Sequence, residues 1–358
     1  MFDIEDIIKL PPYSLNNEQK NKLYKDGMFA LTKKHYEKCS EYRNLLDNFN
    51  FNKNIGHEVE EYIFLPVRLF KEYELRSINK EDVFKTMTSS GTSGQKVSKI
   101  FLDRETASNQ TKVLTRITSD ILGAKRLPML IIDSKEVVKN RQLFSARGAG
   151  ILGFSMLGRD HTYALDVDMN LNISIVKNFL EKHNGEKIFI FGFTFMIWEY
   201  FYKTLRDKNI RFDLSNGIMI HGGGFKKLLD EAVDNDTYKA CLKDVCGIDQ
   251  VYNYYGMVEQ TGSIFMECEH GRLHASIFSD IIIRNYNDFS ICGIGEKGLV
   301  QLISLLPGSY PGHSILSEDI GEQIGEDNCP CGRLGKTFKI HGRVKSAEVR
   351  GCSDTYEK

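Results

Sequence analysis

The chain has 358 residues, of which 41% are hydrophobic and 27% are charged, and its formal net charge is −1. These proportions are typical of a globular protein, and the length predicts about two domains. A net charge near zero excludes a global attraction to nucleic acid or membranes, and no run of basic residues favours a nucleic-acid site.

The chain begins with an acidic segment, Met1–Asp6, rather than with the basic and then apolar segment of a secretory signal. Its sequence has no stretch approaching the ~20 apolar residues that a membrane span needs. Together these features predict a cytoplasmic protein. In that compartment the eight cysteines favour free thiols or metal ligands over disulfides.

Residues 1–82 are predicted to form a helical N-terminal segment. Apolar residues recur at helical spacing between Leu15 and Phe49, and Asn16 or Asn17 can cap this helix. The apolar run 63–67 contains Pro66, which favours a loop or an edge strand over a central strand.

Residues 88–96 are rich in hydroxyl groups and glycine and cannot pack a core; they include Ser89, Ser90, Gly91, Thr92, Ser93, Gly94 and Lys96. Glycine lets successive backbone N–H groups form a cradle for an anion, and the hydroxyls and the lysine add donors. The spacing differs from that of the common P-loop, which has four residues between its glycines. We interpret the segment as a phosphate-binding loop; the alternative is a flexible linker.

Between residues 83 and 250, short apolar runs alternate with helical patterns, which predicts an α/β lobe with a largely parallel sheet flanked by helices. Strands are expected at 129–132, 187–191 and 218–220, and helices at 171–183, 195–208, from Phe225 onward and at 238–246. From 251 to 345 a β-rich lobe is expected, with strands at 263–266, 281–284, 299–303 and 338–340. Residues 346–358 are predicted to be a mobile C-terminal tail.

Two glycine- and tyrosine-rich segments are unusual. The strand 218–220 runs into Gly222, Gly223 and Gly224, and three glycines favour a ligand-facing turn over an ordinary tight turn. In the segment that contains Tyr254, Tyr255, Gly256 and Glu259, the tyrosines can wall a nucleotide base and the glutamate can hold Mg²⁺. Taken alone, cross-strand tyrosines and a surface glutamate are the simpler interpretation of this segment.

Two further groups of residues carry ligand chemistry. Asp319 follows Glu318 before a glycine; a carboxylate there can bind a ribose diol or can belong to a capped turn. Three thiols and an imidazole can form a tetrahedral zinc site, and the residues concerned are Cys268, His274, Cys329 and Cys331. His270 is the alternative imidazole ligand, and unligated thiols are the alternative for the whole group.

In their order along the chain, these motifs resemble those of the adenylate-forming enzymes, which include the acyl-CoA synthetases. The motifs are the hydroxyl-rich loop, Gly222–Gly224, Tyr255–Glu259, Glu318-Asp319 and Gly342-Arg343. Within that superfamily the chain resembles phenylacetate-CoA ligase-like proteins and the LuxE family of acyl-protein synthetases, over roughly residues 83–352. The resemblance implies the α/β fold of the large N-terminal domain of these enzymes and ATP-dependent formation of an acyl-AMP.

The resemblance also implies roles for individual residues. The loop 89–96, with Lys96, would hold the β- and γ-phosphates of ATP, and Glu259 would ligate Mg²⁺. Asp319 would bind the ribose hydroxyls, and Arg343 would lie near the ribose or the α-phosphate. The adenine would contact Gly222, Gly223, Gly224, Tyr254, Tyr255 and Gly256. Zinc-bearing relatives of the phenylacetate ligases support a structural Zn²⁺ at the cysteine and histidine group.

The end of the chain departs from the pattern of the CoA ligases, which continue after the Gly-Arg motif into a C-terminal domain with a catalytic lysine. LuxE-type chains stop near this point and use a cysteine close to the C-terminus as acyl acceptor. Cys352 stands where that cysteine would be. Gly351 before it and the basic residues upstream suit this role, whereas Asp354 and Glu357 downstream oppose it. The alternative is an idle thiol, which the sequence favours when the resemblance is left aside.

Three functions are consistent with these features. The first is an acyl-protein synthetase that activates a carboxylic acid, which can be a fatty acid, and passes the acyl group to Cys352, with an acyl reductase as a partner. The second is a CoA ligase or stand-alone adenylating enzyme that delivers the acyl group to CoA or a carrier protein. The third is a nucleotide-binding assembly subunit without turnover. The sequence does not identify the acid.

Overall fold

The computed structural model describes residues 2–52, 54, 56–89, 96–139 and 146–344. Ser90, Gly91, Thr92, Ser93, Gly94 and Cys352 lie outside the described residues. The chain divides into two compact units: unit 1 combines Met1–Asp120 with Gly256–Arg350, and unit 2 contains Ile121–Tyr255. These limits differ from the predicted boundaries at residues 82 and 250. Residues 83–120 belong with the β-rich region because they pack on it: a Cβ at Gly262 would lie only 2.7 Å from the Gln110 backbone.

The N-terminal part of unit 1 is helical, as predicted. Asn16 caps the long helix α2 (Asn17–Lys38) in a capping box with Gln19. The predicted single helix breaks at Cys39, whose backbone is extended (φ −122°, ψ 110°), before α3 (Ser40–Asn48) begins. The other helices and 3-10 turns of this part are α1 (Ile4–Ile8), η1 (Val59–Glu61), α4 (Leu69–Glu72), η2 (Lys80–Asp82) and α5 (Arg104–Leu122).

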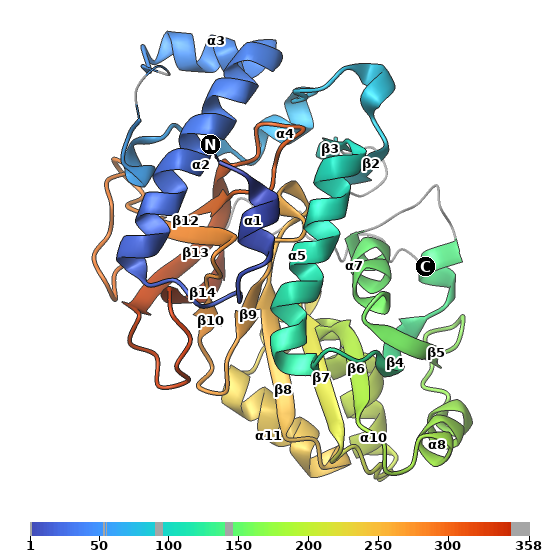
Figure 1. Ribbon diagram of the computed structural model, residues 1–358. Helices are drawn as coiled ribbons and strands as arrows, with labels where there is room; N and C mark the ends of the chain where they lie inside the picture. Colours follow the sequence, from blue (N-terminus) through green and yellow to red (C-terminus); the bar gives the residue numbers. More distant parts are fainter. Residues whose placement is uncertain (1, 53, 55, 90–95, 140–145, 345–358) are drawn as a thin grey trace. The chain divides into compact units, whose positions relative to one another are not determined.

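The sheet of unit 1 is antiparallel, in the order β11-β12-β13-β14-β10-β9. Its strands are β9 (Phe265–Glu267), β10 (Leu273–His274), β11 (Ser279–Arg284), β12 (Lys297–Ser304), β13 (Ser314–Glu326) and β14 (Lys336–Arg343). Helix α2 covers one face of this sheet (Figure 1), and Lys20 Nζ lies 3.4 Å from Asp280 Oδ1. The short strand β1 (Leu65–Pro66) pairs in parallel with β13 at the edge, as Pro66 predicted.

Strand β13 was missed by the sequence interpretation, which placed a turn around Glu318 and Asp319. The segment is instead a 13-residue strand that contains Gly321. A Cβ at position 321 would lie 2.9 Å from the Lys339 carbonyl oxygen, so this position in the strand suits glycine. A second, two-stranded sheet of unit 1 pairs β2 (Lys85–Thr88) with β3 (Lys99–Leu102) as an antiparallel hairpin.

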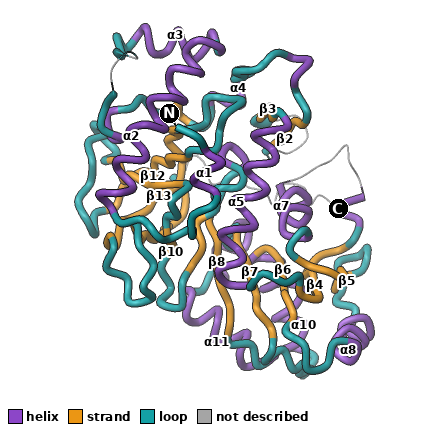
Figure 2. The backbone as a smooth tube through the Cα atoms, viewed as in Figure 1, coloured by secondary structure: helices purple, strands orange, loops and turns teal. Residues whose placement is uncertain are grey.

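Unit 2 confirms the predicted parallel sheet, which has the strand order β8-β7-β6-β4-β5 (Figures 1 and 2). The strands are β4 (Leu127–Ser134), β5 (Gly158–Leu165), β6 (Ile188–Phe193), β7 (Gly217–Gly222) and β8 (Gln250–Tyr255). The helices are α6 (Glu136–Lys139), α7 (Ala146–Ser155), α8 (Ile173–Lys182), α9 (Thr194–Met196), the π-helix η4 (Ile197–Tyr202), α10 (Lys203–Asp207) and α11 (Asn235–Cys246). The helix expected from Phe225 is only the 3-10 segment η5 (Lys226–Glu231), which is kinked at Leu228.

Helices cover both faces of the unit 2 sheet. On one face Phe154 of α7 stacks on Phe191 of β6, with ring centroids 4.3 Å apart. On the other face Tyr238 of α11 lies over His221 of β7 at 4.7 Å. Burial on both faces explains why these strands have continuous apolar runs rather than alternating ones. Within the described part of the chain, every helix is too short or too polar to span a lipid bilayer.

Candidate functional site

Three of the predicted nucleotide-binding residues come together in unit 1. Glu259 lies in the 3-10 turn η6 (Val258–Gln260) and is 4% exposed. Arg343 on β14 is paired in register with Asp319 on β13, and its Nε donates to Asp319 Oδ1 at 2.9 Å. Burial raises the pKa of Glu259, and the positive charges of Lys71 and Arg343 act in the opposite direction. Asp319 and Arg343 thus form an ion pair between neighbouring strands, and Arg343 is near enough to Glu259 to affect the pKa of its carboxyl group.

The hydroxyl-rich loop connects strands β2 and β3, so its two ends are fixed by a hairpin. At the base of the loop, the Ser98 backbone N–H donates to Ser89 Oγ at 2.9 Å. Lys96 is exposed, and its Nζ lies 2.8 Å from Glu72 Oε2 of α4. This ion pair raises the pKa of Lys96, which keeps its side chain cationic.

In unit 2, the predicted glycine turn and one predicted tyrosine are neighbours. Gly222 ends β7 and is in register with Tyr254 of β8, and a Cβ at Gly222 would lie 2.6 Å from the tyrosine ring. Gly223 and Gly224 both have left-handed backbone conformations, with φ of 85° and 64°. Glycine is therefore required here for close approach and for the turn itself. Tyr255 is the last residue of β8, and Gly256 is the first residue of the following segment of unit 1.

His221 precedes this turn and has a defined tautomer. Thr194 Oγ1 donates to the Gly222 carbonyl at 3.1 Å and therefore accepts from His221 Nδ1, which lies at 2.9 Å. Burial lowers the pKa of His221 to about 3, so the ring is neutral near pH 7. A neutral histidine thus connects the carboxyl ends of β6 and β7 through Thr194.

A buried ion pair in unit 2 was missed by sequence reasoning. Asp133, near the end of β4, lies with its Oδ2 3.1 Å from Arg147 Nε of α7. Burial raises the pKa of Asp133 to about 6, and Arg147 opposes this shift. Strand order reverses at β4, and ligands of open α/β sheets bind at such switch points. The available signal was a carboxylate directly after a buried strand and a single arginine in an apolar helix.

The four predicted metal ligands meet in unit 1. Cys268 follows β9, His274 ends β10, and Cys329 and Cys331 lie in the turn between β13 and β14. The four ligand atoms all lie within 4.8 Å of one another; Cys331 Sγ and His274 Nε2 are 3.4 Å apart. His270 is not part of this group. Three thiols and one imidazole at this separation fit the donor set of a structural zinc site.

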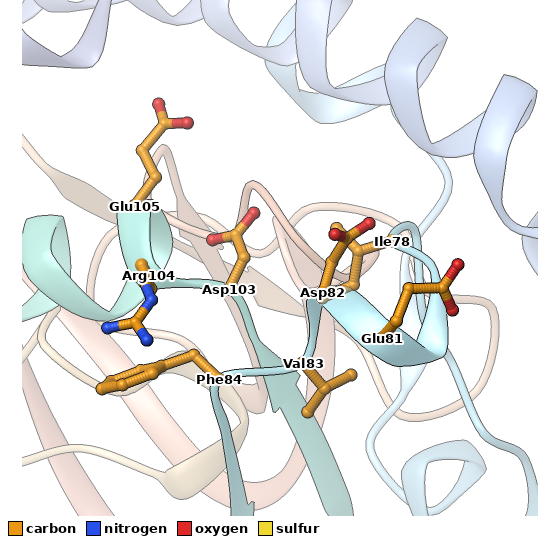
Figure 3. A pocket seen from close by; sticks show the side chains of 8 residues that line it. All are labelled: Ile78, Glu81, Asp82, Val83, Phe84, Asp103, Arg104 and Glu105. Carbon is orange, nitrogen blue, oxygen red and sulfur yellow. The ribbon is translucent and has the colours of Figure 1, made fainter.

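A surface pocket of about 480 Å³ lies elsewhere in unit 1, beside the β2–β3 hairpin (Figure 3). It is lined by Ile78, Glu81, Asp82, Val83, Phe84, Asp103, Arg104 and Glu105. The Arg104 guanidinium is held over the Phe84 ring at 4.6 Å, and Asp103 caps α5 by accepting from the Thr106 N–H. Four carboxylates around one arginine do not suit a phosphate ligand, and none of the predicted site residues lines this pocket.

The family model and the curated relatives that match this chain indicate the same protein family. Residues 2–358 match the family model described as "Acyl-protein synthetase, LuxE". The long-chain-fatty-acid–luciferin-component ligase of Aliivibrio fischeri is 24% identical over 369 residues, which cover 98% of this chain and 92% of the relative. The protein of the same name from Vibrio harveyi is 21% identical with the same coverage.

Solved structures of 2-hydroxyisobutyryl-CoA ligase share the fold. The complex with 2-HIB-AMP in the postadenylation state has a TM-score of 0.69 and 13% identity, over 92% of this chain and 69% of that one. An open conformation with 2-HIB-AMP and CoA has a TM-score of 0.70 and 12% identity, over 93% and 77%. The resemblance and the fold class inferred from the motifs are thereby confirmed.

Proposed function

Because this chain belongs to the LuxE family of acyl-protein synthetases, we propose that it activates a long-chain fatty acid and transfers the acyl group to a cysteine of its own. The family match over residues 2–358 carries this proposal. The enzyme is an ATP-dependent acid–thiol ligase. The acid's carboxylate oxygen attacks the α-phosphorus of ATP, pyrophosphate leaves, and an acyl-AMP forms. A thiolate then attacks the acyl carbonyl carbon, AMP leaves, and a thioester forms.

In unit 1 we assign the charged residues to the phosphates and the ribose. Lys96 and the loop 89–96 neutralise the β- and γ-phosphates, and Asp319 accepts hydrogen bonds from the ribose hydroxyls. Arg343 balances charge near the α-phosphate, since its guanidinium is already oriented by Asp319. Glu259 would hold Mg²⁺, which neutralises phosphate charge when bound. These groups act by positioning and electrostatic stabilisation.

In unit 2 we assign the adenine to Gly222–Gly224, Tyr254 and Tyr255, with Gly256 directly after them in the chain. The left-handed turn at Gly223 and Gly224 exposes backbone groups to which a flat base can bind. The close contact between Gly222 and Tyr254 supports this assignment, because it leaves no space for a side chain other than hydrogen.

We propose Cys352 as the acyl acceptor. It lies within the family match and follows Gly351, and the thioester it would carry has to reach a second protein. That partner would be an acyl reductase or a carrier protein. Direct delivery to CoA is the alternative, and it needs no acceptor cysteine.

Two measurements test the proposal. Purified protein is assayed for ATP–pyrophosphate exchange with palmitate, and radiolabelled palmitate that remains on the denatured protein is released with hydroxylamine. We expect both activities, and we expect Cys352→Ser to retain exchange but lose the covalent label. Cys292→Ser, at a partly exposed cysteine of unit 1, is the matched control. Equal labelling of the Cys352→Ser protein would exclude this acceptor and assign the thioester to another cysteine of the chain, whereas exchange without any label on the wild-type protein would favour CoA or a carrier protein.

We also propose that the group Cys268, His274, Cys329 and Cys331 holds one structural Zn²⁺ per chain. Its function would be to join the β9–β10 hairpin to the turn before β14. Elemental analysis of protein prepared without added metal is expected to find about one zinc, and Cys329→Ser to lower this content. Cys292→Ser is again the control. A folded wild-type preparation without zinc would exclude the site.

A further inference from the structure

The turn that carries Glu259 is short and has few interactions of its own. It is a three-residue 3-10 turn whose N-terminal end has no side-chain cap, and at its C-terminal end Thr261 Oγ1 donates to the Val258 carbonyl at 2.8 Å. A carboxylate that must meet a metal needs a fixed main chain, because the partners around a ligand orient it. The Glu259 carbonyl and the Gln260 side chain, in contrast, make hydrogen bonds to other segments of unit 1.

One loop, Pro307–His313 between β12 and β13, supplies these contacts. The hydroxyl of Tyr310, a fully buried residue, donates to the Glu259 carbonyl at 2.8 Å. The Gln260 side-chain amide donates to the Gly312 carbonyl of the same loop at 2.8 Å. A Cβ at Gly312 would lie 2.2 Å from the Tyr310 ring and 3.1 Å from the Glu259 carbonyl oxygen. The loop thus packs closely against the turn, and a side chain at position 312 would not fit between them.

The same loop is anchored to the N-terminal helices by two buried histidines. His35 of α2 lies with Nε2 2.9 Å from the Pro307 carbonyl, which only accepts, so Nε2 carries the proton. His35 Nδ1 then accepts from Ser77 Oγ at 2.8 Å. At the other end of the loop, His313 Nε2 lies 3.1 Å from Thr32 Oγ1 of α2, and the His35 and His313 rings stack at 5.0 Å.

From these contacts we propose that Tyr310 is a positioning residue for Glu259, held in place by helix α2 through His35 and His313. The helical segment 1–82 then contributes to the adenylation chemistry without touching the nucleotide. This inference rests on the proposed function of Glu259 as the Mg²⁺ ligand. It adds a residue that acts on the metal only through the Glu259 main chain.

The test compares Tyr310→Phe with Tyr24→Phe in the full chain. Both tyrosines are buried, but the Tyr24 hydroxyl has no hydrogen-bond partner among the described residues. Each protein is titrated with Mg²⁺ in the palmitate-dependent ATP–pyrophosphate exchange assay, and its thermal unfolding is recorded. Tyr310→Phe is expected to raise the Mg²⁺ concentration for half-maximal exchange about tenfold, with recovery of most of the rate at saturating Mg²⁺. Tyr24→Phe is expected to leave the titration unchanged.

Two further variants separate the possible failures. Ser77→Ala removes the hydroxyl donor to His35 and keeps the hydrogen bond from the Ser77 backbone N–H to the Ser309 carbonyl of the loop. It is expected to shift the Mg²⁺ titration in the same direction by about twofold to threefold. Glu259→Gln is expected to shift it more than either. If Glu259→Gln alters the titration and Tyr310→Phe does not, the positioning inference is overturned and the proposed function stands. If Glu259→Gln leaves the titration unchanged, the assignment of Glu259 itself is overturned.

Discussion

The two units carry their candidate ligand groups in different ways. In unit 1 the groups are charged side chains, and antiparallel neighbours orient them, as Asp319 on β13 orients Arg343 on β14. In unit 2 the candidate group is the backbone of a glycine turn at the carboxyl end of a parallel strand. The roles proposed for unit 1 therefore depend on which charge is present, whereas the role proposed for unit 2 depends on the absence of a side chain.

The largest expected effect on activity comes from removing one of the charged side chains of unit 1. Lys96→Ala removes a cation from the proposed phosphate loop and should lower ATP–pyrophosphate exchange about 10²–10³-fold, as for loss of one preorganised donor. Lys85→Ala, at an exposed lysine on the same hairpin, should leave exchange unchanged. Because Lys96 is exposed and its ion pair within the described residues is with the exposed Glu72, the unfolding midpoint should not move. Unaltered exchange in a folded Lys96→Ala protein would contradict the role of the loop.

The next largest effect is expected from adding a side chain to the glycine turn of unit 2. Gly222→Ala places a methyl group 2.6 Å from the Tyr254 ring and 2.8 Å from the Tyr254 carbonyl, so β7 or β8 must shift. Overpacking of this kind costs about 1–3 kcal/mol, and exchange should fall together with the free energy of unfolding. Gly56→Ala is the control, because a Cβ there meets nothing within 4 Å. A Gly222→Ala protein with wild-type stability would show that the turn tolerates a side chain.

Acid sensitivity sharpens the comparison further. Burial lowers the pKa of His313 in unit 1 to about 3, whereas an unfolded histidine titrates near about 6.5. Its contribution to stability is therefore complete above about pH 6.5 and is lost as the pH falls toward 3, because the unfolded chain then binds the extra proton. Asp133 in unit 2 has the opposite sign: burial raises its pKa to about 6, so its contribution is lost as the pH rises through that value.

His313→Gln should therefore reduce the slope of unfolding free energy against pH between about 6 and 4 by about 1.4 kcal/mol per pH unit, the value for one proton. Denaturant unfolding at a series of pH values measures this slope. His161→Gln, at an exposed histidine, should leave it unchanged. An identical slope in the His313→Gln protein would mean that the native state accommodates a charged ring at this position.

The smallest expected effect concerns the ion pair between Lys96 and Glu72, both of which are exposed. Exposed pairs contribute little, so Glu72→Gln should leave the unfolding midpoint unchanged and change the KM for ATP by less than about fivefold. Steady-state exchange at varied ATP measures this. A larger decrease in KM would indicate that Glu72 competes with the phosphates for Lys96.

Much of the fold could be predicted because its signals are local. Alternating apolar runs and helical patterns predicted β4, β6, β7, α8 and α11, and Asn16 was one of the two residues predicted to cap α2. The errors arose where tertiary contacts override local preference. Glu318, Asp319 and Gly321 are typical of a turn, yet they lie in a central strand, because β12 and β14 supply hydrogen bonds on both sides. Helix α5 also belongs to the same compact unit as the β-rich region, whereas the predicted lobe 83–250 grouped it with the parallel sheet.

By itself the sequence determined the fold class, the order of the motifs and the types of residue available for chemistry, because these depend on composition and short-range spacing. The tertiary structure decided which distant residues meet. It brought Cys268 to Cys329, and it placed Tyr310 against Glu259 and His35 against Pro307. Such contacts depend on strand register and on loop conformation. A shift of one residue in register would turn a strand's side chains to the opposite face of the sheet. A local sequence pattern does not specify which distant segment of the chain a strand or loop will contact.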